Sequence, residues 1–142
     1  MSCCNNLKRR NYKSIERTFN SNEQTFIASG TTLNLLGTKA TDTGCSIDTG
    51  VNNFTINCNG TYHVCADVTA EPTGAGDLTI QLYRNGVELP CAICTMTVAS
   101  GDTYTLHTET DLYFKSDDVI SLNISGVAGE ATWVGASCVK WA

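Results

Sequence analysis

Hydrophobic and polar residues alternate in short runs from residue 25 to the C-terminus, and no run shows the 3.6-residue period of an amphipathic helix. Within residues 61–70, for example, Tyr62, Val64 and Val68 share one face of an extended chain. The runs expected to form strands are 25–29, 31–35, 45–47, 54–58, 61–70, 77–84, 91–98, 103–114, 119–125 and 132–142. This pattern predicts an all-β, antiparallel sandwich or barrel of about eight to ten strands.

Asparagine, aspartate, glycine and proline separate these runs. Asn85-Gly86 is the strongest hairpin signal, because a two-residue type I′ turn needs positive φ at both positions. Asn59-Gly60 and Ser116–Asp118 predict further tight turns. Short turns of this kind join neighbouring antiparallel strands, so we expect a chain of hairpins.

The first 24 residues differ from the rest of the chain. Residues 1–24 are polar, basic and poor in apolar side chains, and they predict an N-terminal arm that lies outside the core. Residues 25–142 are expected to form one domain, since a chain of 142 residues can bury a core without help from metals or disulfides.

Three segments combine strands and turns in a recognisable order. Residues 53–70 (NFTINCNGTYHVCADVTA) hold an entry strand, a Gly-aromatic pair and an aliphatic strand. Residues 77–89 (DLTIQLYRNGVEL) hold a strand with its Asn-Gly turn, and residues 112–124 (LYFKSDDVISLNI) hold two strands around an acidic turn. In this order, residues 25–142 resemble the C1q/TNF-like family. The resemblance implies a ten-stranded antiparallel jelly-roll sandwich that forms a homotrimer around a three-fold axis.

The same resemblance extends to domains on bacterial spore filaments and to phage fibre heads. No Gly-X-Y tract precedes the domain, and the arm with Cys3-Cys4 is similar to the cysteine-bearing connectors of endospore appendage subunits. This implies a structural subunit that trimerises and assembles through its arm into a disulfide-linked fibre on a spore surface. Its partners would be other copies of the chain, an anchor and a tip protein. The alternative is a phage head or tail fibre or a decoration protein, part of a virion, whose jelly roll binds a receptor or glycan. A soluble carbohydrate-binding module is a third class.

Charge is low in amount and uneven in position. Charged residues are 16% of the chain, the net charge is −5, and five of the nine basic residues lie in the first seventeen positions. An acidic body makes nucleic acid an unfavourable partner. The basic arm could bind nucleic acid or a membrane, but docking on the acidic body of the next subunit is favoured. We expect no membrane span and no signal peptide. For a chain with many cysteines this favours release by lysis, as for a phage particle, or release when a mother cell breaks open around a spore.

The chain has eight cysteines, and the main chemistry that we expect from the sequence is disulfide formation. Cys3 and Cys4 cannot easily bond each other, so we expect them to form disulfides with a neighbouring subunit. The candidate acceptors are Cys45, Cys58, Cys65 and Cys138. Their connectivity stays open, because spacing alone does not determine it.

Other reactive residue types suggest no catalytic or cofactor site. Cys91 and Cys94 form a CxxC, expected to be core or disulfide cysteines and not a redox or zinc pair with His63 and Cys65. Whether they are paired stays open. The histidines, His63 and His107, are expected on the face opposite the core, as polar interface residues. Asp67, Asp117 and Asp118 have carboxylate oxygens of the kind that bind calcium. A solvent-exposed turn explains Asp117 and Asp118 equally well. No catalytic motif is present, so we expect a protein that is not an enzyme and needs no metal or cofactor.

Overall fold

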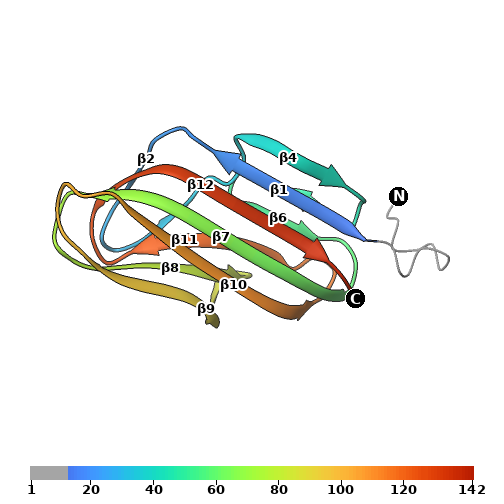
Figure 1. Cartoon of the computed structure of the whole chain (residues 1–142). Coiled ribbons are helices and arrows are strands. Elements are labelled where there is room, and N and C mark those ends of the chain that lie inside the picture. Colours follow the sequence, from blue (N-terminus) through green and yellow to red (C-terminus); the bar gives the residue numbers. More distant parts are fainter. Residues whose placement is uncertain (1–12) are drawn as a thin grey trace.

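The computed structural model describes residues 13–142, and every regular element in them is a strand (Figure 1). Sheet A has the order β10-β7-β12-β1-β4, with β2 paired to β12, and sheet B has the order β5-β6-β11-β8-β9, with β3 paired to β11. The strands of sheet A are β1 (Ser14–Asn20), β2 (Gln24–Phe26), β4 (Thr38–Thr43), β7 (Gly60–Pro72), β10 (Tyr104–Phe114) and β12 (Gly129–Lys140). Those of sheet B are β3 (Thr31–Thr32), β5 (Ile47–Thr49), β6 (Asn53–Ile56), β8 (Gly76–Arg84), β9 (Val87–Val98) and β11 (Val119–Ser125).

Every strand pairing is antiparallel, and the two sheets form a jelly-roll sandwich as the resemblance implies. No helix in the described part of the chain could cross a membrane.

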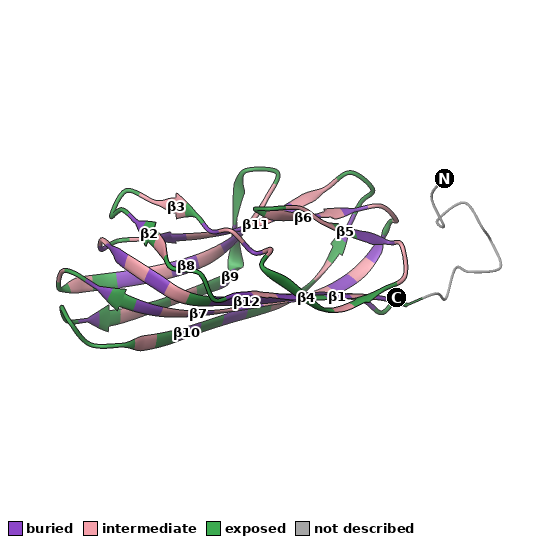
Figure 2. Cartoon of the chain, turned by 90° about the horizontal axis from the view of Figure 1, so that it is seen from above, coloured by how far each residue is buried: buried purple, intermediate pink, exposed green. Residues whose placement is uncertain are grey.

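The core lies between the two sheets and follows the two-residue period of the strands. Buried and partly exposed residues alternate along β7, β8 and β11, which Figure 2 shows as alternating colours. Tyr62, Val64 and Val68 of β7 point inward and are almost completely buried, as the sequence predicted. Leu78 and Ile80 of β8 meet them from the other sheet. Burial of such side chains is the main stabilising term of the fold.

An aromatic pair closes the core near one end of the sandwich. The ring centroids of Tyr62 and Phe114 lie 6.1 Å apart with an interplanar angle of 74°, an edge-to-face contact. The guanidinium carbon of Arg84 lies over the same ring, 4.6 Å from the Phe114 centroid, in a cation–π contact. The Tyr62 hydroxyl donates to the carbonyl of Cys58 at 2.6 Å, which satisfies its buried polar end.

The Asn85-Gly86 hairpin between β8 and β9 is confirmed. Asn85 has φ 51° and Gly86 has φ 78°, so both residues adopt the left-handed region that a type I′ turn requires. The Asn85 side chain also joins this turn to the β10–β11 turn. Its amide nitrogen donates to Asp118 at 2.9 Å, and its oxygen accepts from the backbone N–H of Val119 at 2.8 Å.

The predicted boundary of the arm is wrong, because the domain begins at Ser14 instead of Thr25. β1 lies between β12 and β4 inside sheet A, and it pairs with β12 along its whole length. Its inward residues are polar and buried, so the hydrophobic pattern did not mark it as a core strand. These residues are Ser14, Glu16, Thr18 and Asn20. Residues 1–12 of the predicted arm lie outside the described residues.

β4 was also not expected from the sequence. Its six residues, TKATDT, are almost all exposed and contain no large apolar side chain. β4 forms the edge of sheet A and pairs only with β1 in the described part of the chain. An exposed edge strand with charged side chains discourages pairing with other chains.

We predict that Phe114→Ala lowers the free energy of unfolding by about 3–5 kcal/mol, because it removes a buried ring and leaves a cavity. Urea denaturation followed by circular dichroism measures this change. Tyr113→Ala is the matched control, since Tyr113 is the exposed neighbour on the same strand. A loss of less than 1 kcal/mol for Phe114→Ala would contradict the packing described here.

Candidate functional site

One end of the sandwich is where the chain enters the fold, and we call it the arm end. β1 begins here at Ser14, which pairs with Lys140 at the end of β12, and β7 also begins here (Figure 1). The Oγ atom of Ser14 accepts a hydrogen bond from the backbone N–H of Ser46 at 2.9 Å. This bond holds the segment before β5 against the start of β1.

Cys45 and Cys58 both lie at the arm end. The side-chain amide of Asn57 donates to the carbonyl of Cys45 at 3.1 Å, and its backbone N–H donates to Ser46 at 2.8 Å. These bonds bring the segments that carry the two cysteines side by side. Both cysteines are engaged in disulfide bonds. Cys3 and Cys4 lie outside the described residues.

The other two acceptor candidates are less accessible. Cys138 is completely buried between the sheets, and this burial raises the pKa of its thiol. Cys65 is half-buried on the outer face of sheet A, where its Sγ lies 2.8 Å from the Oγ of Ser137. Both are free thiols. Because a disulfide needs an accessible thiolate, the surroundings of Cys138 favour it least.

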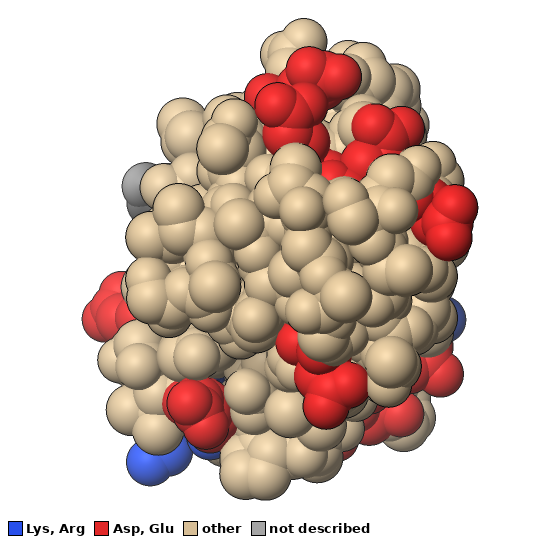
Figure 3. Space-filling view, turned by 90° about the vertical axis from the view of Figure 1, so that its left-hand side faces the viewer, with Lys and Arg blue, Asp and Glu red and all other residues tan. Residues whose placement is uncertain are grey.

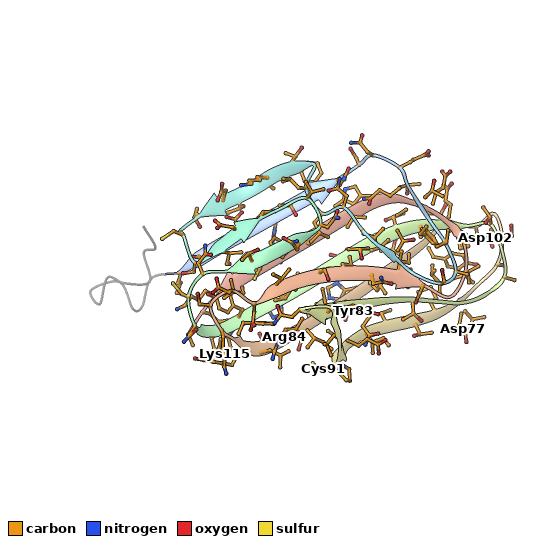
Figure 4. The ribbon with its side chains drawn as sticks, turned by 180° about the vertical axis from the view of Figure 1, so that it is seen from behind. Asp77, Tyr83, Arg84, Cys91, Asp102 and Lys115 are labelled. Atoms are coloured by element: carbon orange, nitrogen blue, oxygen red, sulfur yellow. The ribbon has the colours of Figure 1, made fainter. Side chains whose placement is uncertain are left out.

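The CxxC of β9 holds two free thiols, not a disulfide. Cys91 is exposed at the margin of sheet B, as Figure 4 shows, and its Sγ lies 3.3 Å from the hydroxyl of Thr110. Cys94 is half-buried, and it packs against the core. Residues three apart on a strand point to opposite faces, which explains why these two do not meet.

A buried carboxyl group lies beside the arm end. Glu16 of β1 is only 2% exposed, and its carboxylate accepts a hydrogen bond from Thr49 of β5 at 3.1 Å. Burial, followed by a hydrogen bond with Asp42 of β4, raises the pKa of Glu16 to about 7. The same hydrogen bond lowers the pKa of Asp42, with Lys39 adding to the effect. The hydrogen bond between Glu16 and Asp42 links β1 to the edge strand.

A row of histidines and carboxylates crosses the outer face of sheet A on β7 and β10. His63 Nδ1 lies 2.8 Å from Asp111, and its Nε2 lies 3.5 Å from Glu109. His107 Nδ1 lies 2.6 Å from Asp67, and its Nε2 lies 3.3 Å from Glu109. The hydrogen bond that His107 donates to the carboxylate of Asp67 is the main cause of the raised pKa of His107.

Both histidines thus lie on the face opposite the core, as expected. No group of three metal-binding side chains converges within residues 13–142.

The same outer face has a depression of about 340 Å³ beside this row. Its residues come from β1, β4, β7 and β12: Arg17, Thr18, Phe19, Ala40, Cys65, Asp67, Trp133, Gly135, Ala136 and Ser137. Gly135 and Ser137 are covered although they face outward, because the Trp133 ring lies directly over Gly135. Gly135 and Ser137 are therefore covered within one domain, without contact from a second subunit.

The end opposite the arm end is acidic. β7 finishes there, and Glu130 pairs across the sheet with Glu71. The pKa of Glu130 is raised, mainly by the negative charge of Glu23. A hydrogen bond with Glu23 adds to this effect, and the charge of Glu71 contributes least. Figure 3 views this end directly and shows acidic side chains around it, with basic ones only at the margin. The far end of the domain is therefore opposite in charge to the basic residues of the arm.

The acidic turn at 116–118 has a structural role. Asp118 accepts from the backbone N–H of Lys115 at 2.8 Å and from Asn85, so its carboxylate completes the turn. Asp117 adopts φ 75°, a left-handed conformation that Asp tolerates better than most residues. These contacts agree with the turn explanation and give no support to a calcium site.

Sequence reasoning missed Glu16 and Arg17, because both were assigned to the arm. One signal was present: Ile15 and Phe19 alternate with polar residues, as in a strand. In this strand the apolar side chains face outward and the polar side chains face the core. The alternation therefore did not show which residues are buried. Trp133 lies in the predicted strand 132–142, but its contact with Gly135 depends on the orientation of the ring, which the sequence does not give.

Comparison with known proteins identifies the fold alone. No family model and no curated protein matches the chain. Murine APRIL at pH 5.0 is similar over 90% of this chain and 98% of its own, with a TM-score of 0.73 and 13% identity. Eiger TNF from S. frugiperda has a TM-score of 0.71, 9% identity and 92% coverage of both chains. The globular domain of zebrafish complement 1qA has a TM-score of 0.64 and 10% identity, and covers 87% of this chain and 94% of that one. The fold is a C1q/TNF-like jelly roll.

We predict that the stability of the protein falls as the pH rises from about 5 to 8, and that Glu16→Gln removes most of this fall. The folded pKa of Glu16 lies above its ordinary value of 4.5, so folding holds the proton in place and loses this contribution as the pH rises through about 7. The size is on the order of 1–3 kcal/mol. Urea denaturation at several pH values measures it.

Glu88→Gln is the matched control for Glu16→Gln, because Glu88 is an exposed glutamate on β9. It should leave the pH profile unchanged. Identical profiles for the wild type and Glu16→Gln would show that Glu16 is ionised in the fold.

We predict that His107 titrates above the ordinary histidine value of about 6.5, and that Asp67→Asn lowers its pKa. The stabilisation from this pair is complete at low pH and is lost as the pH rises through the raised pKa of His107. Proton NMR of the imidazole ring measures both values. Asp111→Asn is the control, since Asp111 contacts His63. A titration of His107 that Asp67→Asn leaves unchanged would contradict the pairing.

Proposed function

We propose that this chain is a structural subunit that self-associates around a three-fold axis and is joined to its neighbours through the N-terminal arm. The observation that carries the proposal is the position of Cys45 and Cys58. Both are disulfide-bonded cysteines, and both lie at the end of the domain where the arm enters. This is where the cysteines of a neighbouring arm would first reach the fold.

The length of the arm suits a link between neighbouring copies. Nine residues separate Cys4 from Ser14, where β1 begins. An extended chain spans about 3.3 Å per residue, so the arm reaches about 30 Å, roughly the width of a small domain. The arm of one copy can therefore reach Cys45 or Cys58 of the copy beside it.

Disulfides within one chain and between chains can interconvert without an added oxidant. A thiolate attacks one sulfur of an existing disulfide, forms a new bond with it and releases the other sulfur as a thiolate. A thiolate of a neighbouring arm can thus attack the disulfide at Cys45 or Cys58 and replace it with a disulfide between the two chains as copies assemble. A covalent link of this kind mainly slows the dissociation of subunits and increases their resistance to denaturants.

The difference in charge between the arm and the far end supports stacking of such rings. Lys8, Arg9 and Arg10 lie before the start of the domain, while Glu71 and Glu130 lie at its opposite end. Head-to-tail contact brings the basic arms of one ring against the acidic ends of the next. Contacts of this type do not close on themselves, so they extend into a filament.

A filament on the surface of a spore is the setting we propose, with a virion fibre as the alternative. In the first setting the chain has a mechanical role, and in the second its jelly roll would bind a receptor or glycan; neither role is enzymatic. An anchor and a tip protein would terminate the filament.

We predict that boiling in denaturant without reductant leaves bands at multiples of the 15.2 kDa monomer, and that reductant collapses them to one band. Cys3→Ser with Cys4→Ser, or Cys45→Ser with Cys58→Ser, should abolish the multiples. Cys91→Ser with Cys94→Ser is the control and should retain them, since these thiols lie on β9 and are free. Denaturing gels measure the result.

Electron micrographs of the same samples separate assembly from covalent linkage. We expect filaments for the wild type and for the serine variants, with lower resistance to denaturant in the variants. Wild-type protein that runs as a monomer without reductant would overturn the covalent link. Isolated particles in every micrograph would overturn the filament.

A further inference from the structure

The outer face of sheet A carries opposite charges at its two sides. The side formed by β7 and β10 holds the row of His63, Asp67, His107, Glu109 and Asp111. Three carboxylates face two imidazoles, so the row keeps a net negative charge at neutral pH whichever form the two rings take. Glu109 lies at the centre of the row, because one oxygen of its carboxylate lies 3.5 Å from His63 Nε2 and 3.3 Å from His107 Nε2.

The other side of this face, on β1, is basic. The outward residues of β1 are Ile15, Arg17 and Phe19, and Arg17 is exposed. Arg17 makes no ion pair with any residue between positions 13 and 142. Its guanidinium is therefore available to a carboxylate of another molecule.

Arg17 and Glu109 lie at the same level along the strands. In sheet A, Arg17 pairs with Ser137, and Ser137 pairs with Cys65. Cys65 pairs in turn with Glu109, so one line of residues crosses β1, β12, β7 and β10. Neighbouring strands lie about 4.8 Å apart, which places Arg17 about 14 Å from Glu109 within one domain. The two side chains are too far apart to pair in the same chain, but their equal level allows them to meet across a rotation axis.

The long direction of the domain runs along these strands, from the arm end to the acidic end (Figure 1). Rings that stack arm end to acidic end, as proposed above, have a three-fold axis in this direction. Rotation about such an axis keeps each residue at its own level. The β10 side of one copy then faces the β1 side of the next, and a heterologous contact of this type closes into a ring.

We propose that the basic β1 side of each copy binds the acidic β10 side of the next copy, with Arg17 paired to the carboxylate of Glu109. The proposal rests on the three-fold association proposed above and names the surfaces that form it. A guanidinium offers two parallel donors to the two oxygens of a carboxylate, so this pair also sets the register between copies. The depression beside Arg17 lies at the level of Glu109 and His107, so the margin of the neighbouring sheet would fill it.

The experiment exchanges the two charges in the full chain. The parent carries Cys3→Ser and Cys4→Ser, which removes the arm cysteines, and native mass spectrometry at a series of dilutions measures the trimer and its multiples. Arg17→Glu alone, or Glu109→Lys alone, places like charges across each contact, and we expect the trimer to weaken about tenfold or more. Arg17→Glu combined with Glu109→Lys restores opposite charges, and the trimer should recover most of its affinity.

Recovery in the combined variant reports a contact between copies, because the two residues do not touch within one chain. Lys115→Glu is the control for Arg17→Glu, since it makes the same change of charge at an exposed turn between β10 and β11. It should leave the trimer unchanged. Circular dichroism confirms that each variant is folded.

The outcomes separate this contact from the three-fold association. Single reversals that leave the trimer unchanged overturn the contact, while the association stands. A combined variant that is no more stable as a trimer than the single variants also overturns it, because the two side chains then do not face each other. A parent that is monomeric at every dilution overturns the three-fold association, and this contact with it.

Discussion

The antiparallel pairing of β7 with β12 is the constraint on which the rest of the structure depends. The two long strands pair along β7 from Tyr62 to Pro72 and form the middle of sheet A. Their common register directs Val64, Ala66 and Cys138 toward sheet B and sets Cys65 beside Ser137 on the opposite face. A shift by one residue would reverse every one of these positions, so the core and the outer face are determined together.

The same pairing determines where the cysteines of the arm end and the histidine–carboxylate row lie. β1 joins the free side of β12 at the arm end, which brings the start of the domain to the segments that carry Cys45 and Cys58. β10 joins the free side of β7, which completes the row of histidines and carboxylates. The arm end with its two cysteines and the row of charged side chains on the outer face therefore both follow from one sheet.

The polar inward face of β1 shows how the fold tolerates an unusual strand. Glu16 lies between the sheets, where an unpaired carboxylate would be costly to bury. Hydrogen bonds with Thr49 and Asp42 reduce this cost, and burial raises the pKa of Glu16 to about 7. The edge of sheet A near the arm end is therefore more sensitive to pH than the apolar core around Phe114.

The alternation of residues determined the strands from β6 to β12, because each buries an apolar face against the opposite sheet. The Asn85-Gly86 turn was determined equally well, since few other residues accept its two positive φ angles. Tertiary structure alone decided the place of β1, whose polar residues Glu16 and Thr18 are buried by contacts with other strands. It also decided which cysteines lie at the arm end and how Trp133 covers Gly135. These outcomes depend on contacts between residues far apart in the chain, and a local pattern carries no information about such contacts.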